Sequence, residues 1–172
     1  MTWLPELADG DTGLDRVFGL RPDLYDAFRA FYALFWTDQL LDPIVLELCR
    51  LRVAQLLGCA TEQQVRYAPS RDAGLTESQI AALPRWPDDT RFSEAQRAAL
   101  AFAEQFVLDP HGVTDAQHRE LLEHFSAAQL VELTAGLALF LGFSKIAVAL
   151  GPPPDMPTMV VPTPDWSPDP AA

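Results

Sequence analysis

Four residues of the stretch ELCRLRVAQLLGCATEQQVR, residues 47–66, have side chains that could do chemistry together. Glu47 lies in an otherwise apolar segment, and a carboxylate in a dry pocket is suited to general-base chemistry. Cys59 follows directly after a glycine, and the N-terminus of a helix lowers the pKa of a thiol. Arg66 could bind a carboxylate or another anion, with Glu62 one turn before it. Glu47, Cys59, Glu62 and Arg66 therefore form the candidate catalytic site.

The same residues also allow a purely structural interpretation. Glu47 and Arg50 are spaced i,i+3, and Glu62 and Arg66 are spaced i,i+4 with the acid first, which is the favourable order for a helical ion pair. Two ion pairs would neutralise the buried charges and fill the pocket. In addition, Glu62 works against a redox role for Cys59, because a neighbouring negative charge raises the pKa of a thiol.

The distance between Glu47 and Cys59 decides whether they can share a site. On one continuous helix they would be roughly 18 Å apart. A site that contains both requires the chain to reverse near Gly58, or a second subunit to supply one of the two groups. Continuity through residue 58 would leave Glu47 with a structural role within its own chain.

Helical periodicity dominates the sequence, whereas the alternation typical of strands is nearly absent. Asp42 followed by Pro43 begins a largely apolar helix that continues to about Gly58, because aspartate caps helices and proline suits the first helical position. The fold class is therefore all-α, with six or seven helices. The expected helices begin at Pro22, Pro43, Ala60 (running to about Ala73, with Pro69 expected to kink or shorten it), Thr76, Ser93, Thr114 and Ser126.

Three segments differ in composition. Residues 1–20 form an N-terminal arm, residues 21–151 form one helical domain, and residues 152–172 form a proline-rich tail. So many prolines cannot continue a helix, so we expect an extended, polyproline-like chain. Its apolar residues favour a tail that lies along the domain or a neighbouring subunit, and a disordered tail is the alternative.

The charge and composition exclude several function classes. A formal net charge of −12 argues against binding nucleic acid or an anionic membrane, since both need a basic surface. The longest apolar run holds twelve residues, fewer than the roughly 20 of a membrane-spanning helix. Cys49 and Cys59 would lie roughly 15 Å apart on one helix, too far for a disulfide. With no signal peptide visible, we expect a cytoplasmic protein with free thiols.

The segments LDPIVLELCRLRVAQLLGC, FSEAQRAALAFAEQF and VTDAQHRELLEHFSAAQLVELTAGLALF resemble the alkylhydroperoxidase D-like (AhpD-like) branch of the carboxymuconolactone decarboxylase family. The resemblance covers about residues 20–151. It implies an all-helical, usually oligomeric protein. Peroxidase members of the family carry the pattern E-x11-C-x2-C-x3-H, whose glutamate and first cysteine match Glu47 and Cys59.

The chain departs from this pattern at two positions. Glu62 stands where the family has its second cysteine, and Arg66 stands where it has its histidine. The family's peroxidase cycle needs a second thiol to resolve the oxidised one as a disulfide and a histidine that exchanges protons near neutral pH. Glutamate cannot form a disulfide, and arginine stays protonated. The family's decarboxylases also rely on a histidine, whereas His111, His118 and His124 of this chain lie in later, surface-like segments.

Two functions remain open from the sequence. The first is an enzyme of peroxidase (peroxiredoxin-like) ancestry that has lost dithiol peroxidase activity and acts on a small organic substrate through a single thiol or a Glu/Arg pair. The second is a non-catalytic binding or assembly module on the same fold. In both cases we expect a homo-oligomer, and the sequence contains no metal-ligand cluster, phosphate loop or serine triad that would indicate a metal or a cofactor.

Overall fold

The computed structural model describes residues 3–5, 7, 13–151 and 158–161 of the 172-residue chain. Within these residues the fold is all-α, as predicted, but it has nine α-helices rather than six or seven. One of them, α1, lies inside the segment expected to be an arm. The helices are α1 (Gly13–Phe18), α2 (Pro22–Thr37), α3 (Pro43–Leu56), α4 (Ala60–Gln64), α5 (Ala68–Asp72), α6 (Glu77–Ala82), α7 (Glu94–Leu108), α8 (Asp115–His124) and α9 (Ala127–Leu150).

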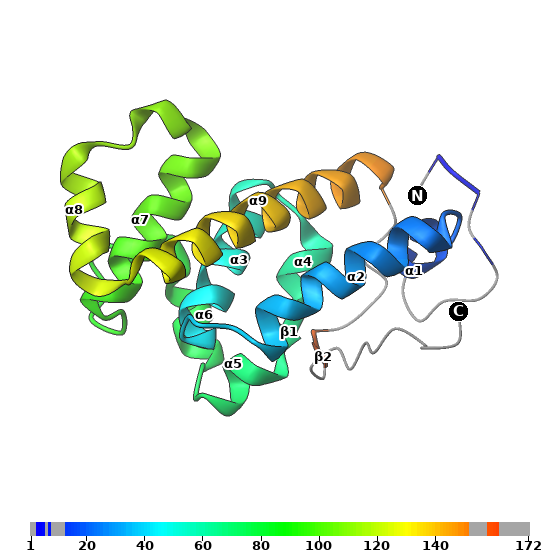
Figure 1. Ribbon diagram of the computed structural model, residues 1–172. Helices are drawn as coiled ribbons and strands as arrows, with labels where there is room; N and C mark the ends of the chain where they lie inside the picture. The colour runs from blue at the N-terminus through cyan, green and yellow to red at the C-terminus, as the bar shows by residue number, and fades with distance from the viewer. Residues whose placement is uncertain (1–2, 6, 8–12, 152–157, 162–172) are drawn as a thin grey trace.

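Helix α3 is the centre of the fold. It begins as its sequence predicts, because the Asp42 side chain accepts a hydrogen bond from the backbone N–H of Ile44 and Pro43 occupies the first turn. It packs against α7 on one side and α9 on the other, and Figure 1 shows α9 crossing the middle of the molecule beside it. Most of its residues are buried, including Glu47 and Arg50. Polar side chains on such a helix must find partners within the protein.

Helix α9 is long and apolar enough to cross a membrane, judged by its length and composition alone. Its 24 residues also carry a buried face that includes Leu133, Leu137 and Phe140. These side chains belong to the same core as α3 and α7. A core helix passes the same test of length and hydropathy, and the packing places one face of α9 in this core.

The chain turns sharply after α3. Gly58 has a φ of 62°, in the left-handed region that side chains with a Cβ rarely adopt. The next residue, Cys59, is the N-cap of α4, so the predicted break before Cys59 is confirmed. Since α4 folds back to contact α3, residues beyond Cys59 lie beside residues in the middle of α3.

Alanine substitution at Gly58 tests backbone strain separately from steric crowding. Gly58→Ala should lower the free energy of unfolding by about 1–2 kcal/mol, because an L-residue is strained at positive φ. Gly142→Ala is the matched control: an added Cβ meets nothing within 4 Å at either glycine, but Gly142 lies inside α9 with no positive φ. There alanine should stabilise the protein by about 0.5–1 kcal/mol. Urea denaturation measures both, and equal changes would contradict the argument.

The helix predicted from Ala60 to Ala73 is wrong, because it is divided into three elements. Helix α4 ends at Gln64, strand β1 spans Val65–Tyr67, and Pro69 lies in the first turn of α5. A proline inside a helix clashes with the carbonyl four residues earlier, which would be that of Val65. The chain therefore leaves the helical conformation at Val65 and resumes it at Ala68.

Strand β1 has a partner that the sequence did not reveal. Strand β2, Met159–Val161, runs parallel to it, with Arg66 aligned to Val160. This part of the predicted tail thus lies along the domain beside the candidate site. Residues 152–157 and 162–172, the rest of the predicted tail, fall outside the described residues.

Only some of the large apolar side chains of α2 face the core. Phe35 is buried and Phe28 packs against the core, whereas Leu24 and Phe31 are exposed. Phe31 lies in a shallow groove of about 300 Å³ between α2 and the first half of α9.

Candidate functional site

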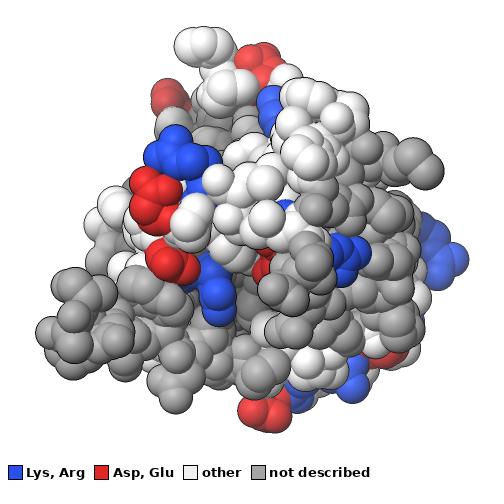
Figure 2. Space-filling model, turned by 90° about the vertical axis from the view of Figure 1, so that its right-hand side faces the viewer, with Lys and Arg blue, Asp and Glu red and all other residues white. Residues whose placement is uncertain are grey.

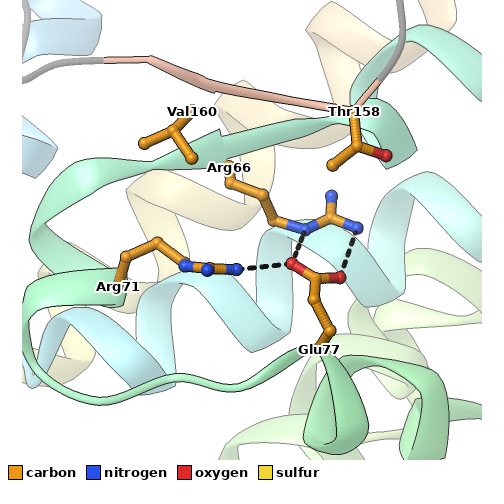
Figure 3. A pocket seen from close by; sticks show the side chains of 5 residues that line it. All are labelled: Arg66, Arg71, Glu77, Thr158 and Val160. Carbon is orange, nitrogen blue, oxygen red and sulfur yellow. Dashed lines mark hydrogen bonds and ion pairs between the residues drawn. The ribbon is translucent and has the colours of Figure 1, made fainter.

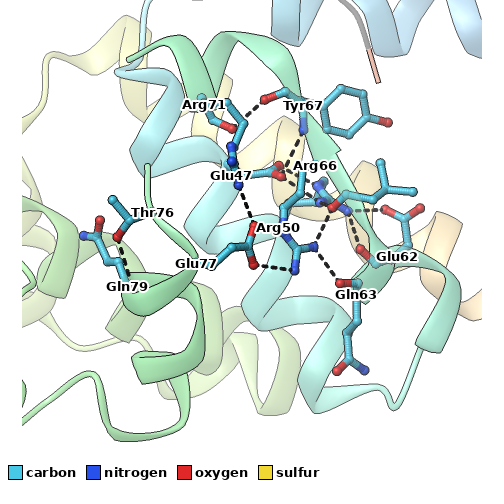
Figure 4. A network of polar contacts seen from close by, with 12 residues as sticks. Glu47, Arg50, Glu62, Gln63, Arg66, Tyr67, Arg71, Thr76, Glu77 and Gln79 are labelled. Atoms are coloured by element: carbon cyan, nitrogen blue, oxygen red, sulfur yellow. Dashed lines mark hydrogen bonds and ion pairs between the residues drawn. The ribbon is translucent and has the colours of Figure 1, made fainter. Parts of the chain in front are cut away.

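Arg50 on α3 is the hub of a buried ion-pair network. Its Nε and Nη2 donate to the two carboxylate oxygens of Glu47 at 2.7 and 2.9 Å, which confirms the pairing predicted from their i,i+3 spacing. Its Nη1 donates to Glu62 Oε2 at 2.8 Å and to the backbone carbonyl of Glu62 at 2.9 Å. Nη2 also donates to the carbonyl of Val65 at 2.7 Å. The five N–H groups of this guanidinium therefore each have an acceptor (Figure 4).

Glu47 is held by two elements at once. Besides Arg50, its Oε1 accepts a hydrogen bond of 3.2 Å from the backbone N–H of Tyr67 on β1. The Tyr67 ring lies 5.1 Å from the Arg50 guanidinium carbon and stacks on Trp36 of α2 at 4.1 Å between ring centroids. The carboxylate is thus fixed in place, and it serves to attach β1 to α3.

The network contains two carboxylates and one guanidinium. Burial raises the pKa of Glu62, and the charge of Arg50 acts in the opposite direction. For Arg50 burial acts to lower the pKa, but Glu47 and Glu62 outweigh it and hold that pKa well above its ordinary value. The cation therefore remains charged, and the two acids compete for a single counter-charge.

Cys59 is buried beside this network and is not an activated thiol. Only 1% of its surface is exposed, and it packs with Ala54 of α3 and with Phe143 and Ala147 of α9. Burial raises its pKa, and this outweighs the opposing effects of the Glu62 backbone N–H and the Ser144 hydroxyl. The predicted lowering of the thiol pKa at this helix N-terminus is wrong, because desolvation dominates.

Cys49 is a second buried free thiol, on α3. Burial raises its pKa to about 12. Cys49 belongs to the main core cluster and Cys59 to the smaller one beneath α9. Both cysteines are free in the structure, but the separation argued from the sequence does not apply, because the helix ends before Cys59.

Arg66 does not pair with Glu62, so the predicted i,i+4 ion pair is wrong. The strand at Val65–Tyr67 directs Arg66 to another partner, Glu77 in the first turn of α6, with N–O distances of 3.2 and 3.3 Å. Its Nη1 donates to the carbonyls of Gln63 and Val65. Glu77 also accepts from Arg71 at 2.6 Å (Figure 3). The structure therefore brings Glu47 and Glu62 together on Arg50, places Cys59 next to Glu62, and directs Arg66 away from them to Glu77.

Three residues of this region escaped the sequence reasoning. Tyr67 acts through its backbone N–H, which no side-chain pattern can reveal. Glu77, the partner of Arg66, lies 11 positions after it on α6, and Arg71 of α5 shares that carboxylate. No signal in the sequence indicated Glu77, because a continuous helix would already have paired Arg66 with Glu62.

The three histidines lie away from the site. His111 is in the short 3-10 helix Pro110–Gly112, His118 is on α8 and His124 ends α8, and the first two are exposed. Figure 1 shows α8 at the opposite end of the molecule from α1, with α4 and β1 between them. Within the described residues, no three His, Cys, Asp or Glu side chains are grouped in a way that could hold a metal ion.

The hollow beside this region has a volume of about 360 Å³ and is open to solvent. It is lined by Arg66, Arg71 and Glu77 and by Thr158 and Val160 of the tail. Figure 3 shows both guanidinium groups directed at the Glu77 carboxylate, with Thr158 and Val160 above them. Figure 2 shows acidic and basic side chains next to each other on one face of the molecule. The buried Cys59 and Glu47 do not line the hollow.

Known proteins resemble this chain in sequence and in fold. A sequence model of the carboxymuconolactone decarboxylase family matches residues 22–105. The uncharacterised protein YdfG of Bacillus subtilis is 30% identical over 106 residues, covering 61% of this chain and 72% of YdfG. The uncharacterised YnjA of Escherichia coli is 32% identical over 99 residues, covering 58% of this chain and 54% of YnjA.

A solved structure has the same fold. It is the alkylhydroperoxidase AhpD core of an uncharacterised peroxidase-related protein from Ralstonia eutropha, with a TM-score of 0.72 and 23% identity, covering 83% of this chain and 76% of that one. The fold is therefore AhpD-like. The chain belongs to the carboxymuconolactone decarboxylase family, as its sequence motifs predicted.

Proposed function

We propose that this protein is a family member of peroxidase ancestry that has lost dithiol peroxidase activity and now serves as a non-catalytic binding or assembly module. The ancestry is supported by the AhpD-like fold and by the match of Glu47 and Cys59 to the family pattern. The loss is supported by Glu62 and Arg66 at the positions of the second thiol and the histidine.

One observation carries the proposal: Arg50 binds both candidate carboxylates. A general base must have a lone pair that can reach a substrate proton. Glu47 has Arg50 on both of its oxygens and the Tyr67 N–H on one, and Glu62 is bound through Oε2. Glu47, Arg50 and Cys59 are all at most 1% exposed. These side chains hold α3, α4 and β1 together, which is a structural task.

The environment of Cys59 also supports the loss of peroxidase activity. Peroxide reacts with a thiolate rather than a thiol, and burial favours the neutral form of Cys59. A sulfenic acid formed there needs a second thiol to be resolved, and Cys49 lies in a different cluster of the core. We therefore expect neither step of a dithiol cycle to proceed at a useful rate.

Peroxide consumption tests this directly. With dithiothreitol as reductant and hydrogen peroxide or an organic hydroperoxide as substrate, turnover by the wild type should equal that of Cys59→Ser. A coloured disulfide reagent at pH 7–8 should modify neither cysteine in the native protein and both in urea. Turnover that disappears in Cys59→Ser would overturn the proposal and favour single-thiol chemistry instead.

The assembly part of the proposal is supported by exposed apolar side chains on α2, on the loop that follows it and on α9. Phe31, Leu34, Leu40 and Val131 line the shallow groove between these helices and are exposed. A patch of this kind is typical of protein interfaces. Association of copies of this chain through the groove is measured by sedimentation velocity over a range of protein concentrations, and a strictly monomeric protein would exclude it.

A further inference from the structure

The hollow beside Arg66 is built differently from the buried network. Two arginines face it and share one acid, so its charged side chains sum to +1 if all are ionised. Arg66 has a side chain only 7% exposed, whereas that of Arg71 is 37% exposed. A fixed, desolvated guanidinium beside an accessible one is an arrangement suited to binding an anion.

The hydrogen-bond donors of the two arginines are unequally used. Arg66 donates four of its five N–H groups to Glu77 and to the carbonyls of Gln63 and Val65. Within the described residues, Arg71 donates one of its five N–H groups, to Glu77. Both arginines therefore keep N–H groups that could bind a ligand, and most of these belong to Arg71. By contrast, the guanidinium of Arg50 has none left.

The size and chemistry of the walls narrow the class of ligand. The hollow is open to solvent, and its volume of about 360 Å³ limits an occupant to a small molecule that stays partly exposed. Val160 and the Thr158 methyl group offer an apolar side, and the Thr158 hydroxyl offers a further polar contact. The local charge of +1 is balanced by a monoanion, whereas a dianion would leave the occupied site with a net negative charge.

We propose that the Arg66–Arg71–Glu77 hollow binds a small organic monocarboxylate, whose carboxylate pairs with Arg71 and whose apolar part lies against Val160. The site is formed by α5, α6, β1 and β2, so an occupant would contact the tail strand as well as the domain. The inference does not depend on the reactivity of Cys59, which does not line this hollow.

Opposite charge changes at two neighbouring exposed positions test the proposal. Arg71→Gln brings the local charge to zero and leaves the Arg66–Glu77 pair intact, while Glu77→Gln raises the local charge to +2. The probe is benzoate, with benzamide as its neutral analogue and inorganic phosphate as the alternative anion. Nuclear magnetic resonance of the 15N-labelled full chain follows the backbone amides of Arg71, Thr158 and Val160 during titration.

Benzoate should shift these amides, and benzamide should not. Affinity for benzoate should fall by about tenfold in Arg71→Gln, because a hydrogen bond to a charged group is lost, and it should rise in Glu77→Gln. Arg21→Gln is the matched control, since Arg21 pairs with Asp23 at an exposed site outside the hollow. The resonance spectra also show whether each variant is folded.

Four results would overturn the proposal. They are no saturable shift with benzoate, equal binding of benzamide, equal effects of Arg71→Gln and Arg21→Gln, and tighter binding of phosphate than of benzoate. Weaker binding in Glu77→Gln would likewise contradict the charge argument. Salt should weaken benzoate binding, because the contact with Arg71 is exposed and is screened over about 10 Å at 0.1 M ionic strength.

Discussion

Replacing Arg50 by methionine is expected to lower the free energy of unfolding by about 3–5 kcal/mol, a larger change than Gly58→Ala or Arg52→Met should cause. The substitution keeps an apolar stem of similar length but leaves Glu47 and Glu62 buried without a counter-charge. It also leaves the carbonyls of Glu62 and Val65 without their Arg50 donor. Removing only the cation of a buried ion pair lowers stability far more than replacing the whole pair by apolar residues.

Urea denaturation measures this effect, and a second arginine of α3 supplies the control. Arg52 pairs with Glu104 at a partly exposed position, so Arg52→Met should cost about 1 kcal/mol or less. Adding Glu47→Gln and Glu62→Gln to Arg50→Met should restore much of the lost stability, since no buried charge then remains. If Arg50→Met and Arg52→Met cost the same, the buried network does not hold the fold together.

The same variant should have a distinctive pH dependence. Burial already raises the pKa of Glu62, and Arg50 is the main influence that lowers it, so removing Arg50 raises that pKa further. A carboxyl whose folded pKa lies above its unfolded value binds more protons in the folded state. Relative to the wild type, Arg50→Met should therefore recover stability as pH falls through the raised pKa. The recovery should be complete below the unfolded value of about 4.3.

The sequence predicts the parts of this fold that depend on local chemistry. Asp42 with Pro43 begins α3, and Gly58 ends the segment before Cys59, because caps and positive φ are properties of one or two residues. The Glu47–Arg50 pair could also be predicted from the sequence, since both residues lie on one helix at neighbouring turns. The family resemblance then supplied the arrangement of the helices.

The rest depended on contacts between elements. Pairing Glu62 with Arg66 assumed a continuous helix, and strand β1 removed that assumption. Once the helix ends at Gln64, Glu62 pairs with Arg50 and Arg66 pairs with Glu77. The strand in turn has a partner, Met159–Val161, that comes much later in the chain. Parallel pairing over such a distance leaves no signal in local periodicity.

Replacing Glu62 by cysteine is expected to give the protein a disulfide that the wild type cannot form. Cys59 is the N-cap of α4 and position 62 is the third helical residue, two positions whose side chains meet in capping boxes. Arg50 would still pair with Glu47, so one cation would face one carboxylate. Peroxide would oxidise one thiolate to a sulfenic acid, and the second thiol would displace water from it to form the disulfide.

Counting free thiols after denaturation tests this variant. The count should fall from three to one on treatment of Glu62→Cys with peroxide and return to three after reduction. Cys59→Ser in the same background is the control and should keep its two thiols. Oxidation should remain slow, because position 59 is buried, and adding Arg66→His should not accelerate it, since that side chain leads to Glu77. A wild type that consumes peroxide as fast as Glu62→Cys would show that the missing second thiol is not what silences this site.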